Sequence, residues 1–146
     1  MMTGGGKADA YLSGLASKIA SAKEVRVGFL EGATYDDGTP VAMVAAIQEY
    51  GAPSKGIPPR PFMRPTVANH SGEWPDQLAK TMQHFDYDAE KSLDAMGSLI
   101  GGEIRQAIVD VTAPPLKPAT IKRKGFDKPL IDTGHMLNSV GVEVTT

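Results

Sequence analysis

The chain has 146 residues, a formal net charge of −2 and no cysteine. This length is enough for one domain with its own core, and the lack of cysteine excludes disulfides, cysteine-ligated zinc and a cysteine nucleophile. The pI of about 5.9 argues against a dedicated nucleic-acid-binding domain, for which values above about 9 are usual. No segment approaches the roughly 20 apolar residues of a membrane span, and the first residues show no targeting pattern, so we expect a soluble protein.

The first elements are predicted from glycine content and apolar spacing. We expect residues 1–6 to form a flexible start, because three of them are consecutive glycines. Apolar residues then recur every three or four positions and predict an amphipathic helix over about 7–21. Strict alternation of apolar and other residues predicts a half-buried strand over 24–30.

A second helix is marked at both ends. Thr39 and Pro40 are typical of a helix cap and a first helical position, and Gly51 is a typical end. Since the helix between them is apolar on more than one face, we expect it to be buried or to pack against a second subunit.

The segment 48–66 contains five prolines. Proline fixes φ and lacks an N–H, so residues 57–65 are predicted to be a rigid extended ribbon rather than helix or central strand. In an extended chain, alternate side chains point to the same side, and arginine and aromatic residues are typical of protein contacts. An equally weighted alternative places Phe62 in the chain's own core and leaves the arginines in water. The candidate interface residues are Tyr50, Arg60, Phe62 and Arg64.

The second half of the chain is predicted to be mainly helical. We expect an irregular stretch over 67–73, a helix from Trp74 to about residue 85, a long helix over about 88–111 and a terminal strand over 140–145. These elements predict a single α+β domain over 7–146, in which a small antiparallel or mixed sheet packs against helices that include one long helix.

The long helix contains Gly97, Gly101 and Gly102. Each glycine costs about 1 kcal/mol relative to alanine in a helix. We therefore expect a packing reason, such as the close approach of another backbone, or a kink.

Residues 129–134, PLIDTG, are similar to the loop that presents the catalytic aspartate of aspartic proteases. Such a protease needs a long β-rich chain after this loop, whereas here twelve residues follow Gly134. We therefore interpret Asp132 and Thr133 as a helix cap for a short turn over 135–139. An aspartic-protease-like hydrolase, with Asp132 in a dimeric acid pair, is kept as the weakest alternative.

The remaining polar residues show no catalytic pattern. The three histidines lack metal-binding spacing, and there is no nucleophile elbow or phosphate-binding loop, so we expect no catalytic residue, metal or cofactor. One basic cluster lies over 117–128. We interpret it as a solvated loop; the alternative is a phosphate contact by Lys122, Arg123 and Lys124, which would fit a nucleic-acid-binding adaptor.

Three stretches, residues 25–53, 57–66 and 115–144, together resemble the virion-morphogenesis proteins of tailed bacteriophages and prophages, the neck or tail-completion group. The most specific pieces are Glu-aromatic-Gly before Pro-Arg-Pro-Phe, here 49–51 and 59–62, and the late Asp-Thr-Gly-x-x-x-x-Ser, here 132–139.

The resemblance implies a mixed α+β subunit without catalytic activity or cofactor. It implies assembly as a ring, commonly a hexamer, in the neck of the virion after synthesis in the host cytoplasm. The implied partners are further copies of the chain, the head connector or adaptor and the tail tube or terminator. The basic cluster leaves a passing contact with phage DNA as an alternative to a solvated loop, and no contact with membranes is expected.

Overall fold

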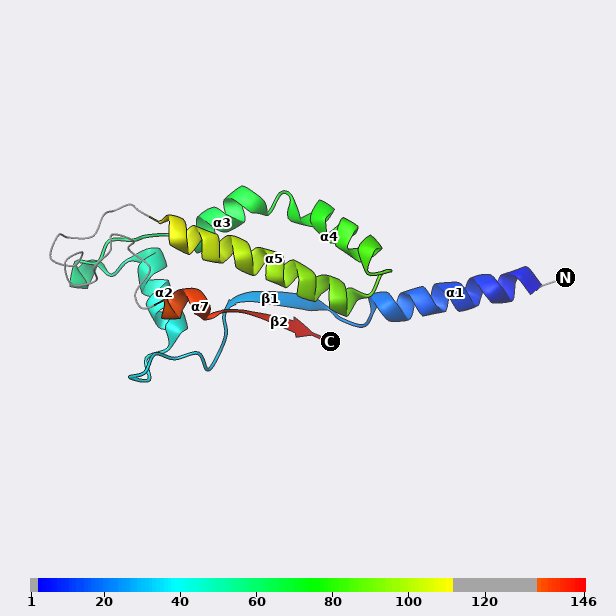
Figure 1. Cartoon of the computed structure of the whole chain (residues 1–146), viewed down its shortest axis with the longest axis horizontal. Coiled ribbons are helices and arrows are strands. Elements are labelled where there is room, and N and C mark those ends of the chain that lie inside the picture. The colour runs from blue at the N-terminus through cyan, green and yellow to red at the C-terminus, as the bar shows by residue number, and fades with distance from the viewer. Residues whose placement is uncertain (1–2, 112–133) are drawn as a thin grey trace.

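The longest helix, α5 (Ala89–Asp110), lies between a two-stranded sheet and two shorter helices (Figure 1). The computed structural model describes residues 3–111 and 134–146. The elements follow in the order α1 (Thr3–Ile19), β1 (Glu24–Phe29), α2 (Val41–Tyr50), the 3-10 turn η1 (Pro53–Lys55), α3 (Met63–His70), α4 (Trp74–His84), α5, α7 (His135–Asn138) and β2 (Val140–Thr145). The predicted α+β class, with one long helix and an antiparallel sheet packed on helices, is confirmed.

The two strands pair antiparallel from end to end, with Glu24 opposite Thr145 and Phe29 opposite Val140. β2 has its predicted bounds, and β1 ends one residue earlier than predicted. The sheet joins a strand near the start of the chain to its last strand. Its pairing therefore holds β1 and β2 together against α5.

The glycines of α5 differ in their surroundings. Gly97 and Gly101 face the valines of the sheet, while a Cβ on Gly102 would meet nothing within 4 Å. A packing reason is therefore present at Gly97, but the nearest atoms belong to valine side chains of β1 and β2 and not to another backbone. Gly102 has no such explanation.

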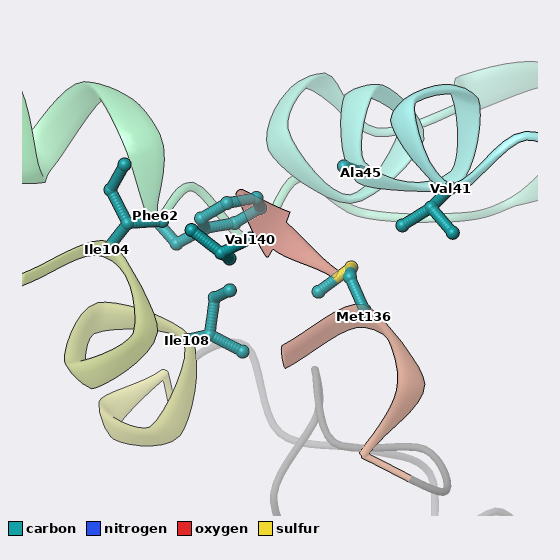
Figure 2. Packing of buried hydrophobic residues seen from close by; sticks show 7 residues of the cluster. All are labelled: Val41, Ala45, Phe62, Ile104, Ile108, Met136 and Val140. Atoms are coloured by element: carbon teal, nitrogen blue, oxygen red, sulfur yellow. The ribbon is translucent and has the colours of Figure 1, made fainter. Parts of the chain in front are cut away.

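The hydrophobic core lies at the end of the sheet where α2 and α7 meet α5 (Figure 2). Its members come from five separate segments, so it forms only when distant parts of the chain meet. The buried cluster consists of Val41, Ala45, Phe62, Ile104, Ile108, Met136 and Val140.

The starts of two helices differ from the predictions. α1 begins at Thr3, so residues 3–6 are helical despite their glycines. α2 begins at Val41, one residue later than predicted, and Pro40 occupies the cap position with an extended ψ of 132° and no side-chain hydrogen bond. The predicted end is confirmed, since Gly51 closes α2 with φ of 75°.

The predicted extended ribbon is wrong from Met63 onward, where α3 begins. Pro65 lies in the first turn of this helix, where a missing N–H breaks no intrahelical hydrogen bond. The expected irregular stretch after residue 66 is likewise helical as far as His70. By contrast, α4 and α5 begin and end within one residue of their predicted bounds.

In the part of the chain that the structure describes, every helix is too short or too polar to span a membrane.

Candidate functional site

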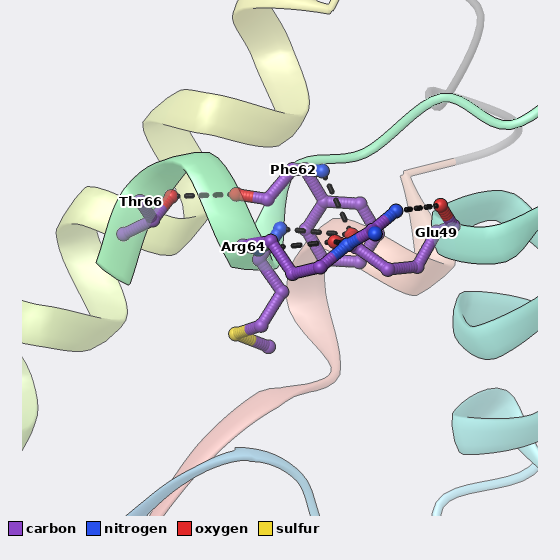
Figure 3. A network of polar contacts seen from close by, with 5 residues as sticks. Glu49, Phe62, Arg64 and Thr66 are labelled. Atoms are coloured by element: carbon purple, nitrogen blue, oxygen red, sulfur yellow. Dashed lines mark hydrogen bonds and ion pairs between the residues drawn. The ribbon is translucent and has the colours of Figure 1, made fainter. Parts of the chain in front are cut away.

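Glu49, in the last turn of α2, caps the start of α3. Its buried carboxylate accepts backbone hydrogen bonds from Phe62 and Met63 at 2.8 and 2.9 Å on Oε2, and from Arg64 at 3.0 Å on Oε1 (Figure 3). These N–H groups belong to the start of α3, where helices leave donors unsatisfied, and the cap residue of α3 makes no side-chain hydrogen bond of its own. A negative charge at this end also interacts favourably with the helix dipole.

The Arg64 side chain also joins the start of α3 to the end of α2, on the solvent side of Glu49. Its Nε donates to Oε1 of Glu49 at 2.9 Å, and its Nη2 donates to the main-chain oxygen of Glu49 at 3.0 Å. The guanidinium carbon lies 4.6 Å from the centre of the Tyr50 ring, which is cation–π geometry. Three separate contacts thus hold the Arg64 side chain in one position.

The Glu49 carboxyl group stays ionised although it is buried. Burial alone would raise its pKa, but the hydrogen bonds from the three backbone N–H groups and from Arg64 outweigh burial, and the net effect lowers the pKa below its ordinary value. Glu49 is therefore a buried anion at neutral pH. We call Glu49, its three N–H donors and the Arg64 side chain the Glu49 clamp.

Gly51 allows the proline-rich segment 57–62, called the ribbon below, to pack against the end of α2. Its φ is 75°, and a Cβ at this position would lie 2.8 Å from both the Ile57 oxygen and the Pro59 nitrogen. One step further, the Arg60 N–H donates to the Gln48 oxygen at 2.6 Å. No residue with a side chain fits position 51 without moving the ribbon.

The structure brings the four candidate interface residues together around the Glu49 clamp, but not on one side. Phe62 is 2% exposed and packs edge-to-face on Phe29, with 5.9 Å between ring centres, so it belongs to the core alternative. Arg60 is also buried. Tyr50, which is 64% exposed, and the half-exposed Arg64 reach the surface. The expected common direction of residues 60, 62 and 64 is wrong, because the chain turns helical between them.

The central role of Glu49 was not predicted from the sequence. One signal was present: a carboxylate near the carboxyl end of an otherwise apolar helix is opposed by the helix dipole, so it needs a partner elsewhere. The partner lies 13 to 15 residues further along the chain. Spacing alone does not identify such a contact.

The phosphate-contact residues Lys122, Arg123 and Lys124 and the cap residues Asp132 and Thr133 lie outside the described residues. In the described part, the cap position of α7 is Gly134, with φ of 75° and no side-chain hydrogen bond. Within residues 3–111 and 134–146, no three histidine or carboxylate side chains are grouped to hold a metal ion.

Comparison of the chain with protein-family models, curated proteins and solved structures finds no match. The motif of the resemblance nevertheless has a physical role in this fold. Residues 49–51 supply the capping carboxylate, the exposed aromatic ring and the glycine, and residues 59–62 form the returning ribbon. The motif therefore supplies Glu49 and Phe62 to the Glu49 clamp and Tyr50 to the aromatic–arginine pair beside it, while Arg64 follows the motif in the chain.

Proposed function

We propose that this protein is a structural component of a tailed phage or prophage virion, in which copies assemble as a ring that joins the head connector to the tail. The observation that supports this proposal is that the two parts of the most specific motif of the resemblance, 49–51 and 59–62, meet at the Glu49 clamp, where Tyr50 and Arg64 lie at the surface. The proposed partners are further copies of the chain, the head connector or adaptor and the tail tube or terminator. The proposed location is the virion neck, after assembly in the host cytoplasm.

The clamp has the physical properties of an assembly surface. Tyrosine and arginine are enriched among residues that dominate binding energies. Binding normally orders flexible side chains, which opposes association. Arg64 is already held by its contacts with Glu49 and Tyr50, so little of its freedom remains to be lost. The Tyr50–Arg64 pair is thus a preorganised contact for a neighbouring virion protein.

Tyr50→Ala tests the proposal without touching the hydrogen bonds of the Glu49 clamp. We expect the purified variant to unfold at nearly the wild-type temperature, while electron microscopy of particles made with it shows unjoined heads and tails. Leu99→Ala, which shortens another exposed apolar side chain on α5, is the matched control. Virions of normal appearance with Tyr50→Ala, or virions that lack this protein, would overturn the proposal.

A further inference from the structure

The first helix, α1, extends away from the rest of the molecule (Figure 1). It has 17 residues and is therefore roughly 25 Å long. Tyr11, Leu12 and Ile19 are exposed large apolar residues, with Leu12 at 58%. Leu15 is the one half-buried residue among residues 5–19, and the others in that range are exposed.

The exposed apolar side chains of α1 form one stripe. Residues 8, 12, 15 and 19 are separated by four, three and four positions, which places them on one side of a helix, with Tyr11 beside them. α1 also contains glycines at 4–6 and 14, which disfavour helix. An isolated helix of this length is marginal in water even with better helix formers, so its apolar stripe needs a partner.

Two polar contacts join the carboxyl end of α1 to the α4–α5 region. The Lys18 ammonium donates to Asp86 at 2.6 Å, and the Glu90 N–H donates to the Ser21 hydroxyl at 3.1 Å. Asp86 and Tyr87 form a tight turn between α4 and α5 with φ of 52° and 62°. One contact lies in the last turn of α1 and the other just beyond it, and the large apolar residues of the stripe at positions 12 and 19 are exposed.

The same chain carries an apolar hollow along α5, between β1 and the α3–α4 pair. Its volume is about 220 Å³, space for roughly seven water molecules at about 30 Å³ each. Val67, which is 45% exposed, lies at this hollow. Water in an apolar hollow lacks hydrogen-bond partners, so apolar side chains are the better occupants. The lining includes Val25, Val27, Val67, Trp74, Ile100 and Ile104.

We propose that α1 of one copy packs its apolar stripe into the hollow between β1, α3 and α4 of a second copy. The two surfaces match in chemistry, and each chain carries one of each. A contact between different surfaces of identical subunits is heterologous, and such contacts generate rings when the rotation closes. The inference rests on the proposed ring and assigns α1 and the hollow as one of its contacts. A pair of α1 helices is the less favoured arrangement, because two heptads of apolar spacing fall short of the three or four expected of a coiled coil.

The absence of cysteine from the sequence allows a direct test by disulfide cross-linking in the full chain. Leu12→Cys and Val67→Cys place single thiols on the stripe and at the hollow, both at exposed positions. The matched control is Ala10→Cys, an exposed position on the same turn but roughly 160° around the helix from Leu12. Each pair of proteins is mixed, oxidised mildly and analysed by non-reducing electrophoresis.

We expect the mixture of Leu12→Cys and Val67→Cys to give a disulfide-linked dimer as its main product, and the mixture of Ala10→Cys and Val67→Cys to remain mostly monomeric. Equal cross-linking in the two mixtures, or Leu12→Cys dimers forming equally well without Val67→Cys, would overturn the inference. If virions lacked the protein, the proposed function would be wrong, but the expected cross-link would be unaffected. If virions contained the protein and were joined normally but Leu12→Cys and Val67→Cys gave no cross-link, only the inference would be wrong.

Discussion

A Cβ atom on Gly97 of α5 would lie 2.3 Å from Cγ1 of Val142 in β2. Nonbonded carbon atoms at optimal separation lie about 3.5 to 4.0 Å apart, so helix and sheet approach at a distance that only glycine permits here. A second obstacle, Cγ2 of Val25, would lie at 2.9 Å. The glycine at position 97 therefore allows α5 to pack this closely against both strands.

The first prediction is that Gly97→Ala lowers the free energy of unfolding, because overpacking costs about 1 to 3 kcal/mol. The gain in helix propensity, about 1 kcal/mol, offsets part of this cost, so we expect a net loss of up to about 2 kcal/mol. Gly102→Ala is the matched control on the same helix. It meets nothing within 4 Å, so we expect it to stabilise the protein by up to about 1 kcal/mol. Urea unfolding of both variants measures the difference, and a Gly97→Ala variant as stable as Gly102→Ala would show that the sheet does not press on this position.

The second prediction concerns the Glu49 clamp. Glu49→Gln keeps the size of the side chain but replaces one acceptor oxygen by an amide NH₂, which then faces an N–H donor of α3. We expect the free energy of unfolding to fall by about 2 to 4 kcal/mol, since hydrogen bonds to a charged group are lost in a buried place. Glu31→Gln, at an exposed position, is the control and should change little. Equal stability of the two variants would mean that the cap contributes nothing.

The third prediction is a pH dependence that belongs to Glu49. The pKa of its carboxyl group is lower in the folded than in the unfolded chain, where the ordinary value is 4.5. The group therefore stabilises the fold fully above that value, and this contribution is lost as pH falls through the folded-state pKa. The stability gap between wild type and Glu49→Gln should be large near pH 7 and shrink in acid. Chemical denaturation across the acidic range measures the gap, and a gap that stayed constant would contradict the lowered pKa.

Local pattern was sufficient to predict much of the fold. The strands β1 and β2 and the helices α4 and α5 follow from apolar period and end signals, because each such segment buries one face. The rest of the fold could not be predicted, because it depends on contacts between residues far apart in the sequence. The start of α3 depends on a carboxylate 13 to 15 residues away, so proline content alone gave the wrong structure for residues 63–65.

The sequence singled out the residues of the candidate site but not their geometry. Tyr50 and Arg64 lie at the surface as an aromatic–arginine pair, whereas the sequence pattern grouped Arg64 with Arg60 and Phe62. Phe62 is buried because the turn into α3 rotates it toward Phe29, and alternation along an extended chain cannot anticipate that rotation. A pattern of period two holds only while the backbone stays extended.

The last prediction separates core from interface within the candidate site. Phe62→Ala should lower the free energy of unfolding by about 3 to 5 kcal/mol, because it removes a buried ring and leaves a cavity against Phe29. Tyr50→Ala should lower it by about 1 kcal/mol or less, the size of an exposed cation–π contact. Phe62→Leu, which fills part of the cavity, should recover part of the loss. Guanidinium unfolding of the isolated subunit provides the comparison. A Phe62→Ala subunit that remained as stable as Tyr50→Ala would return Phe62 to the interface, because only a side chain without a role in the subunit's own core can be removed at so small a loss of stability.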